Sequence, residues 1–145
     1  MPKFGMSGDT HRSKTFERVL DAILDSGVDY NEPRAGETYK IGSSVIEVLN
    51  PNTLTGDFHV GSLAVRIVYG EIGFMFTGDV ETPVERQIID RGYNLKAQII
   101  QLGHHGSRTS NSRDFLDKVK PEVAIYSAGK DNSYGHPHDE IIQRL

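Results

Sequence analysis

The chain has 145 residues, of which 37% are hydrophobic and 25% charged, and 16 basic against 20 acidic side chains give a net charge of −4. These values fit one globular domain and exclude both a disordered chain and a protein whose overall positive field attracts nucleic acid. The absence of cysteine excludes disulfides, thiolate zinc sites and a cysteine nucleophile, and no apolar run is long enough to span a membrane.

The first part of the chain predicts one helix followed by short strands. In residues 15–26 the apolar side chains share one helical face, and Gly27 is a natural stop. Runs of β-branched and aromatic residues between turn residues predict strands. These predicted strands cover residues 39–41, 45–49, 62–69 and 74–77, with a hairpin turn at 70–73.

The second part predicts helices alternating with strands. A helix is expected to begin at Thr82 as its cap, with Pro83 in the first position and Glu85 closing a capping box, and to end before Gly92. The remaining predictions are a strand at 97–102, a helix at 112–119, a strand at 123–127 and a helix at 137–145. Such alternation is typical of an α/β layer with parallel strands, in which loops at the carboxyl ends of the strands line the site.

Asp79 and two tandem histidines follow neighbouring strands of this layer. Asp79 comes directly after the strand at 74–77, where a carboxylate can bridge two cations or simply cap a helix or turn. His104 and His105 follow the next strand between two glycines. Tandem histidines point in different directions, so we expect at most one metal ligand, and the alternative is that both face solvent.

The other histidines are weaker candidates when each is taken alone. His136 and His138 flank Pro137, which stiffens their loop, although a helix cap and a solvent-facing side chain are equally compatible with these positions. His59 lies in a loop before a strand, where a lone histidine is more often a surface residue than a ligand. His11 has no supporting context and is expected at the surface.

Taken together, these residues indicate a metal site. Five of the six histidines and one aspartate lie in loops that the predicted strand order brings to one edge of the sheet. Imidazole and carboxylate are the ligands of zinc and manganese hydrolases, which also keep an open position for water.

Four segments of the chain resemble the metallo-hydrolase domain of ComEC-type competence proteins. They are Phe-Thr-Gly-Asp-Val-Glu at 76–81, Gly-His-His-Gly-Ser at 103–107, Lys-Pro-Glu-Val-Ala-Ile-Tyr-Ser at 120–127 and Asn-Ser-Tyr-Gly-His-Pro-His at 132–138. The resemblance implies the C-terminal part of a metallo-β-lactamase αββα sandwich with a zinc or manganese site at one edge. It also implies hydrolysis of DNA or another phosphodiester during uptake, in a domain that is often extracytoplasmic.

The resemblance also implies roles for individual residues. Asp79 becomes the bridging carboxylate, and His59 matches the H-x-x-G-S ligand segment of the superfamily, where ComEC-type chains more often have asparagine. His136 is favoured as the last metal ligand, with His138 second. The remaining histidines of the four segments would act on the substrate or support the metal ligands; these are His104, His105 and His138. Direct metal binding by His104 is left open as an alternative.

The strongest motif of that superfamily, H-x-H-x-D-H, is not found in the sequence. We therefore expect residues 1–145 to form a single partial domain that is inactive alone, binds divalent metal weakly or not at all, and self-associates through uncovered apolar sheet surface. Two other functions are compatible with the sequence. One is a non-catalytic metal-binding or interaction module, and the other is a hydrolase of a lactone, thioester or lactam.

Overall fold

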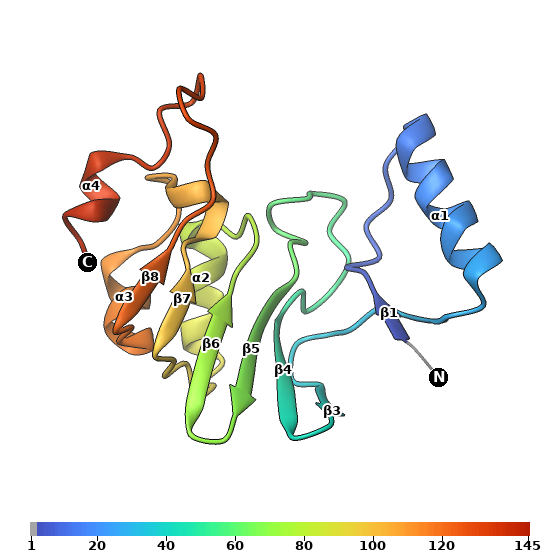
Figure 1. Cartoon of the computed structure of the whole chain (residues 1–145), viewed down its shortest axis with the longest axis horizontal. Coiled ribbons are helices and arrows are strands. Elements are labelled where there is room, and N and C mark those ends of the chain that lie inside the picture. The colour runs from blue at the N-terminus through green and yellow to red at the C-terminus, as the bar shows by residue number, and fades with distance from the viewer. Residues whose placement is uncertain (1–2) are drawn as a thin grey trace.

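The main sheet has six strands in the order β3-β4-β5-β6-β7-β8. The computed structural model describes residues 3–145, and its fold is α/β (Figure 1). The strands of the main sheet are β3 (Thr38–Ile41), β4 (Ser44–Asn50), β5 (Ala64–Tyr69), β6 (Ile72–Phe76), β7 (Ile99–Gln101) and β8 (Val123–Ile125). Strands β3 to β6 form an antiparallel meander, whereas β6, β7 and β8 are parallel.

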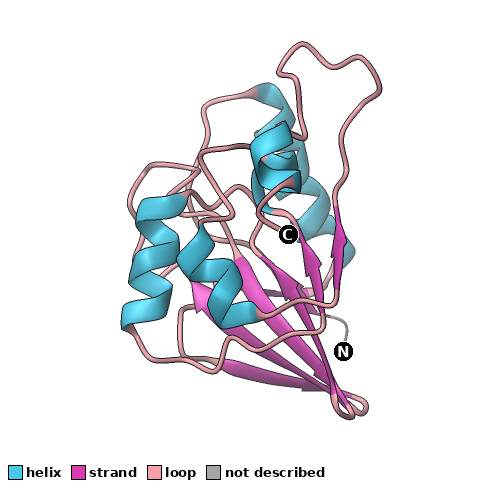
Figure 2. Ribbon diagram, turned by 90° about the vertical axis from the view of Figure 1, so that its left-hand side faces the viewer, coloured by secondary structure: helices cyan, strands magenta, loops and turns pink. Residues whose placement is uncertain are grey.

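The parallel strands are joined by helices, as the predicted alternation required. Helix α2 (Thr82–Asp90) connects β6 to β7, α3 (Arg113–Val119) connects β7 to β8, and the short α4 (Asp139–Ile142) follows β8. Figure 2, a side view, shows the strands as one fanned layer with helices beside it. The carboxyl ends of β6, β7 and β8 therefore open toward the same edge of the sheet.

One face of the sheet forms the apolar core with α2, α3 and α4. Because side chains alternate along a strand, Met75 of β6 and Ile100 of β7 point to the same face, where both are fully buried. Helices contribute Val84, Ile88, Phe115, Leu116, Val119 and Ile141 to this core. On the opposite face, Val123 and Ile125 of the edge strand β8 are about half exposed, at 49% and 53%.

The N-terminal segment forms a small unit of its own. Strands β1 (Lys3–Gly5) and β2 (Asp29–Asn31), which the sequence patterns did not predict, pair in parallel. Helix α1 (Lys14–Ser26) connects them, with Ser13 as its N-cap and a left-handed Gly27 as its C-cap, in agreement with the predicted helix. In residues 3–145 the second sheet has these two strands alone.

The predicted cap of α2 was wrong. The N-cap residue is Glu81, and the Thr82 hydroxyl donates instead to the carbonyl oxygen of Thr109 at 2.9 Å. Glu85 does not close a capping box, because its carboxylate is buried and accepts hydrogen bonds from the segment that starts α3.

Among the helices in residues 3–145, none combines the length and the apolar character needed to cross a membrane.

Candidate functional site

Five imidazole rings gather at the carboxyl edge of the main sheet. The ring centroid of His104 lies 5.0 Å from that of His59, 6.4 Å from that of His105 and 5.8 Å from that of His136. His138 extends the group, with its ring centroid 4.9 Å from that of His136. The predicted histidines from three separate loops therefore meet, and we call these five residues the histidine cluster.

Within the described part of the chain, one set of side chains in this region is spaced to hold a metal ion. Ligand atoms of His59, Glu81 and His104 all lie within 4.8 Å of one another, and Nδ1 of His104 is 3.7 Å from Oε1 of Glu81. Two imidazoles and a carboxylate fit zinc or manganese. The set differs from the ligands favoured from the sequence, because it contains Glu81 and His104 but neither Asp79 nor His136.

Asp79 lies between the two histidine loops of this set. Its backbone N–H donates to Oγ of Ser62, three residues after His59 in the chain, at 2.9 Å. The carbonyl oxygen of the preceding Gly78 accepts the N–H of His104 at 2.8 Å. The backbone of Gly78 and Asp79 thus ties the loops of His59 and His104 together. The bridging role of the half-buried Asp79 carboxylate stays a prediction.

The loop of His104 and His105 has an unusual backbone. His104 (φ 50°, ψ 45°) and His105 (φ 57°, ψ 23°) are both left-handed, which costs roughly 1–2 kcal/mol for each non-glycine residue. A buried side chain, that of Asn111, accepts the N–H of Gly103 at 2.9 Å and donates to its carbonyl oxygen at 3.0 Å. A Cβ on Gly103 would lie 2.6 Å from Oγ1 of Thr77, so glycine is required there. Strain held by buried hydrogen bonds is typical of functional loops.

The loop of His59 is fixed by polar side chains on both sides. The Asp57 carboxylate accepts hydrogen bonds from the backbone N–H groups of His59 at 2.9 Å and Val60 at 3.0 Å. These hydrogen bonds lower the pKa of the Asp57 carboxyl below its ordinary value, and the bond from Val60 has the largest effect. From the neighbouring strand, the Asn50 side chain donates to the carbonyl oxygens of Val60 and Ser62 at 2.7 and 2.9 Å. The exposed His59 ring therefore projects from a fixed backbone.

Hydrogen bonds assign different tautomers to the neutral rings of two cluster histidines. Nδ1 of His105 lies 2.8 Å from the carbonyl oxygen of Ser127, which can only accept, so Nδ1 carries the proton and Nε2 has a free lone pair. Nδ1 of His138 accepts the backbone N–H of Arg108 at 3.2 Å, so Nε2 carries the proton there. Burial lowers the pKa of His136, and the neighbouring imidazoles lower it further by a smaller amount. The neutral form of His136 is therefore favoured.

Glu81 is the site residue that sequence reasoning missed. The predicted start of α2 at Thr82 treated Glu81 as an ordinary residue before the helix, whereas it is the N-cap itself. A signal was present, since Glu81 follows Asp79 by two residues in the same loop, and a carboxylate is favoured at a helix N-terminus.

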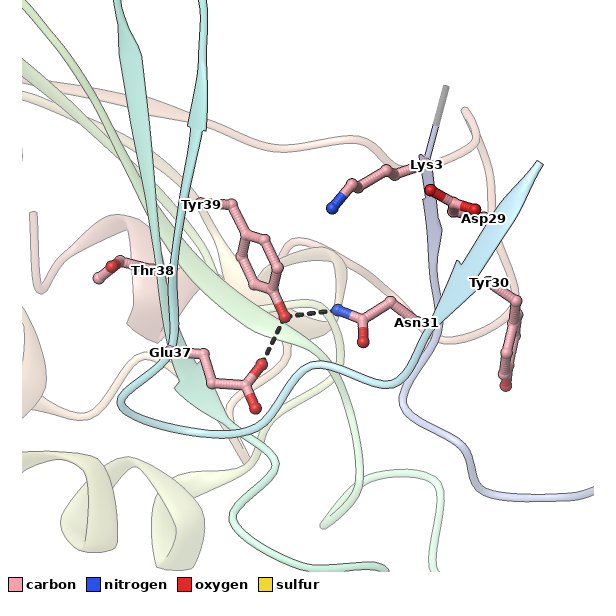
Figure 3. A pocket seen from close by; sticks show the side chains of 7 residues that line it. All are labelled: Lys3, Asp29, Tyr30, Asn31, Glu37, Thr38 and Tyr39. Carbon is pink, nitrogen blue, oxygen red and sulfur yellow. Dashed lines mark hydrogen bonds between the residues drawn. The ribbon is translucent and has the colours of Figure 1, made fainter. Parts of the chain in front are cut away.

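A separate polar pocket of about 590 Å³ opens between β1–β2 and β3 (Figure 3). The Tyr39 hydroxyl is at its centre, where it donates to the Glu37 carboxylate and accepts from the Asn31 amide. The bond to Glu37 is the largest cause that raises the pKa of Tyr39. This pocket shares no residue with the histidine cluster, so it plays no part in the candidate metal site.

Comparison with known proteins gives relatives from bacterial competence systems. No protein-family model matches the chain. The chain is 34% identical over 130 residues to ComE operon protein 3 of Bacillus subtilis, an alignment that covers 89% of this chain and 17% of that protein. It is 37% identical over 132 residues to Recombination protein 2 of Haemophilus influenzae, with 87% and 16% covered. It is 41% identical over 85 residues to competence protein ComA of Neisseria gonorrhoeae, with 58% and 12% covered.

The chain therefore spans between 12% and 17% of the length of these three relatives. Two of the alignments extend over most of this chain, and so include the loops of His59 and His104 and the sheet that carries them. These similarities point to a relationship with the competence proteins of bacterial DNA uptake, confined to one segment of those much longer proteins.

Proposed function

We propose that this chain carries the metal-binding edge of a phosphodiester hydrolase that acts on DNA during uptake. The observation that carries the proposal is the convergence of His59, Glu81 and His104, whose ligand atoms lie within 4.8 Å of one another. With His59 exposed and both Glu81 and His104 only half-buried, the three ligands form an open site, as a hydrolytic metal centre requires, rather than a closed structural one.

The three residues would hold a zinc or manganese ion. Asp79, two residues before Glu81 in the chain, is the residue we propose to support a second ion. A divalent ion bound there would lower the pKa of a water molecule and neutralise charge on a phosphate. The proposed metallo-β-lactamase sandwich is consistent with this arrangement, since one sheet with its helices on one face resembles one half of such a domain.

Cluster residues outside the metal set have complementary roles in this proposal. The Nε2–H of His138 can donate a hydrogen bond to a phosphate oxygen, whereas Nε2 of His105 can accept a proton. Both rings are oriented by backbone groups, which reduces the entropy lost when substrate binds. His136, held toward its neutral form, lies between them and adds no positive charge that would repel a metal ion.

Metal binding by the purified chain tests the proposal directly. Calorimetric titration with Mn²⁺ or Zn²⁺ should show weak binding that drops by roughly tenfold or more in His59→Ala and in His104→Ala, since even supporting residues of metal sites contribute that much. His11→Ala is the matched control, because His11 is exposed and lies outside the cluster. Equal affinity in all four proteins would contradict the metal site.

Activity then separates the classes of hydrolase. The chain alone is expected to show little turnover, so hydrolysis is measured on a full-length relative that carries the matching segment, with bis-p-nitrophenyl phosphate, DNA, a lactam and a thioester as substrates. Metal-dependent hydrolysis of the two phosphodiesters alone, lost when the residue matching Asp79 is replaced by alanine, is the expected result. Hydrolysis of the lactam or thioester in preference to the phosphodiesters would overturn the assignment.

A further inference from the structure

An exposed tyrosine adjoins the histidine cluster. The segment between β8 and α4 projects beyond the carboxyl edge of the main sheet (Figure 1), and in it the Tyr134 side chain is 76% exposed. Its ring is nearly parallel to that of His136, with 5.6 Å between centroids and 20° between the planes. One face of the Tyr134 ring thus packs on the cluster, and a flat aromatic group in solution can reach the other.

The loop that presents Tyr134 is held rigidly by one side chain. The Asn132 amide donates to the carbonyl oxygens of Gly129 at 2.9 Å and His136 at 2.7 Å. Its Oδ1 accepts the N–H groups of Tyr134 at 3.2 Å and His136 at 3.0 Å. Both amide atoms of Asn132 therefore form hydrogen bonds that fix the loop. Because the backbone at Tyr134 is already ordered, little conformational entropy of the loop is lost when a ligand binds.

A pocket is lined by the residues of this loop and of the chain just before it. It measures about 450 Å³, within the usual range for small-molecule sites, and is lined in part by Tyr126, Lys130, Asn132 and His136. Tyr126 is 50% exposed, and Lys130 is exposed as well. The loop thus combines two accessible aromatic rings with the Lys130 cation, beside which lies the exposed Asp131. Aromatic rings and a cation are the groups that bind the bases and phosphates of single-stranded nucleic acid.

We propose that Tyr134 stacks an unpaired base of single-stranded DNA and so brings the adjoining phosphate to the histidine cluster. This deepens the proposed function and rests on it. In a duplex the faces of the bases are covered by their neighbours, so only an unpaired base offers a face to Tyr134. With a net charge of −4, the chain has no overall attraction for DNA, and local stacking has a correspondingly larger share of the binding.

Oligonucleotide binding to the purified chain tests the proposal. Fluorescence anisotropy with a labelled oligo-dT, at low salt and in EDTA to exclude metal effects, should show binding about tenfold weaker for Tyr134→Ala and unchanged for Tyr134→Phe, which keeps the ring. Tyr69→Ala is the matched control, because Tyr69 is 60% exposed at the opposite end of the sheet (Figure 1). Equal affinity of wild type and Tyr134→Ala would overturn the proposal.

Matched ligands identify what Tyr134 recognises. A strand of abasic nucleotides keeps every phosphate but has no base to stack, so it should bind wild type and Tyr134→Ala equally, and the fully paired duplex should do the same. A tenfold difference between these proteins for the abasic strand or the duplex would show that Tyr134 contacts the backbone and not a base. Tighter binding of single-stranded RNA than of DNA would overturn the assignment to DNA.

Fluorescence gives a second readout that does not depend on affinity differences. The chain contains no tryptophan, so Tyr134→Trp introduces a single reporter at the proposed stacking position. Oligo-dT should quench its emission on binding, whereas the abasic strand should not. Emission unchanged at oligo-dT concentrations that saturate the anisotropy signal would contradict base stacking.

The two proposals can fail separately. Metal titrations are made without DNA, and Tyr134→Ala should leave metal affinity unchanged because Tyr134 is not among the proposed ligands. If no metal binding is found but Tyr134→Ala still weakens oligo-dT binding, the hydrolase is rejected and a surface that binds single strands is retained. The reverse pattern would reject base stacking alone.

Discussion

The buried carboxylate of Glu85 accepts the backbone N–H of Asn111 at 2.6 Å through one oxygen and that of Ser112 at 2.9 Å through the other. Ser112 is the N-cap of α3, and Asn111 pairs with the backbone of Gly103 at the start of the histidine loop. A side chain of α2 therefore fixes both the start of α3 and the loop that carries two cluster histidines.

Asn111→Ala should lower the free energy of unfolding by about 2–4 kcal/mol. The change leaves the N–H and carbonyl oxygen of Gly103 without partners, and it places alanine at a left-handed φ of 59°. Urea unfolding measures the effect, with the exposed Asn52→Ala as the control. A loss below 1 kcal/mol would mean that the loop does not depend on this side chain.

The stability contribution of Glu85 should depend on pH. Burial is the largest influence on its carboxyl and raises the pKa, although hydrogen bonds from Ser112 and Asn111 oppose this. The folded protein therefore binds the carboxyl proton of Glu85 more tightly than the unfolded chain does. The stability that this proton contributes is present at low pH. It is lost as pH rises from the ordinary glutamate pKa through the raised one.

Glu85→Gln removes this titration, and it also leaves one of the two backbone N–H groups without an acceptor, a cost that does not vary with pH. The difference in unfolding free energy between wild type and Glu85→Gln should therefore be largest at low pH and shrink as pH rises. Urea unfolding at several pH values checks the trend, and a difference that grows with pH would show that the pKa of Glu85 is lowered.

His105→Gly should raise the free energy of unfolding in metal-free buffer by up to about 1 kcal/mol. Glycine adopts the left-handed conformation without strain, and the lost hydrogen bond to Ser127 is exposed. Lys120→Gly, at the left-handed C-cap of α3, is the matched comparison and should give a similar gain. If Lys120→Gly stabilises the protein and His105→Gly destabilises it, the His105 ring must contribute more to the fold than its contacts indicate.

The purified chain should self-associate through the exposed face of β8. Val123 and Ile125 are about half exposed on an edge strand, where unpaired backbone groups and apolar side chains favour pairing with a second copy. The double variant Val123→Lys/Ile125→Lys should shift sedimentation toward the monomer. Leu24→Lys on α1, which alters an apolar side chain that is 79% exposed and lies away from the sheet, should not. Monomeric wild type at high concentration would refute this expectation.

Most of the main sheet could be predicted from the sequence because its signals are local. Apolar alternation and turn residues located β3 to β6, and the alternation of helices and strands gave the parallel order of β6, β7 and β8. Strands β1 and β2 were missed because each has three residues and exposed side chains, so neither has an apolar pattern. The cap of α2 was misassigned because the Thr82 hydroxyl forms a tertiary bond to Thr109, which no local pattern encodes.

The candidate site was predictable as a region but not as a set of contacts. Strand order was enough to bring the histidine loops to one edge, since loops after neighbouring parallel strands must meet. Which atoms converge depends on loop geometry, and the pairing of Glu81 with His104 depends on left-handed backbone angles, which are uncommon for residues other than glycine. The loop is held by the hydrogen bonds of Asn111 to Gly103, eight residues apart in the chain, and no helix or strand pattern predicts such a pairing.

The three proposed ligands come from three different connections of the main sheet. His59 precedes β5, Glu81 follows β6 and His104 follows β7, so a single ion bound to all three would act as a cross-link between neighbouring strands. An ion that binds only the folded site stabilises that site and opposes local opening of the segments that it joins. Amide hydrogen exchange in the loops beside β5, β6 and β7 should therefore slow together on addition of Mn²⁺ or Zn²⁺, while α1 continues to exchange at its own rate.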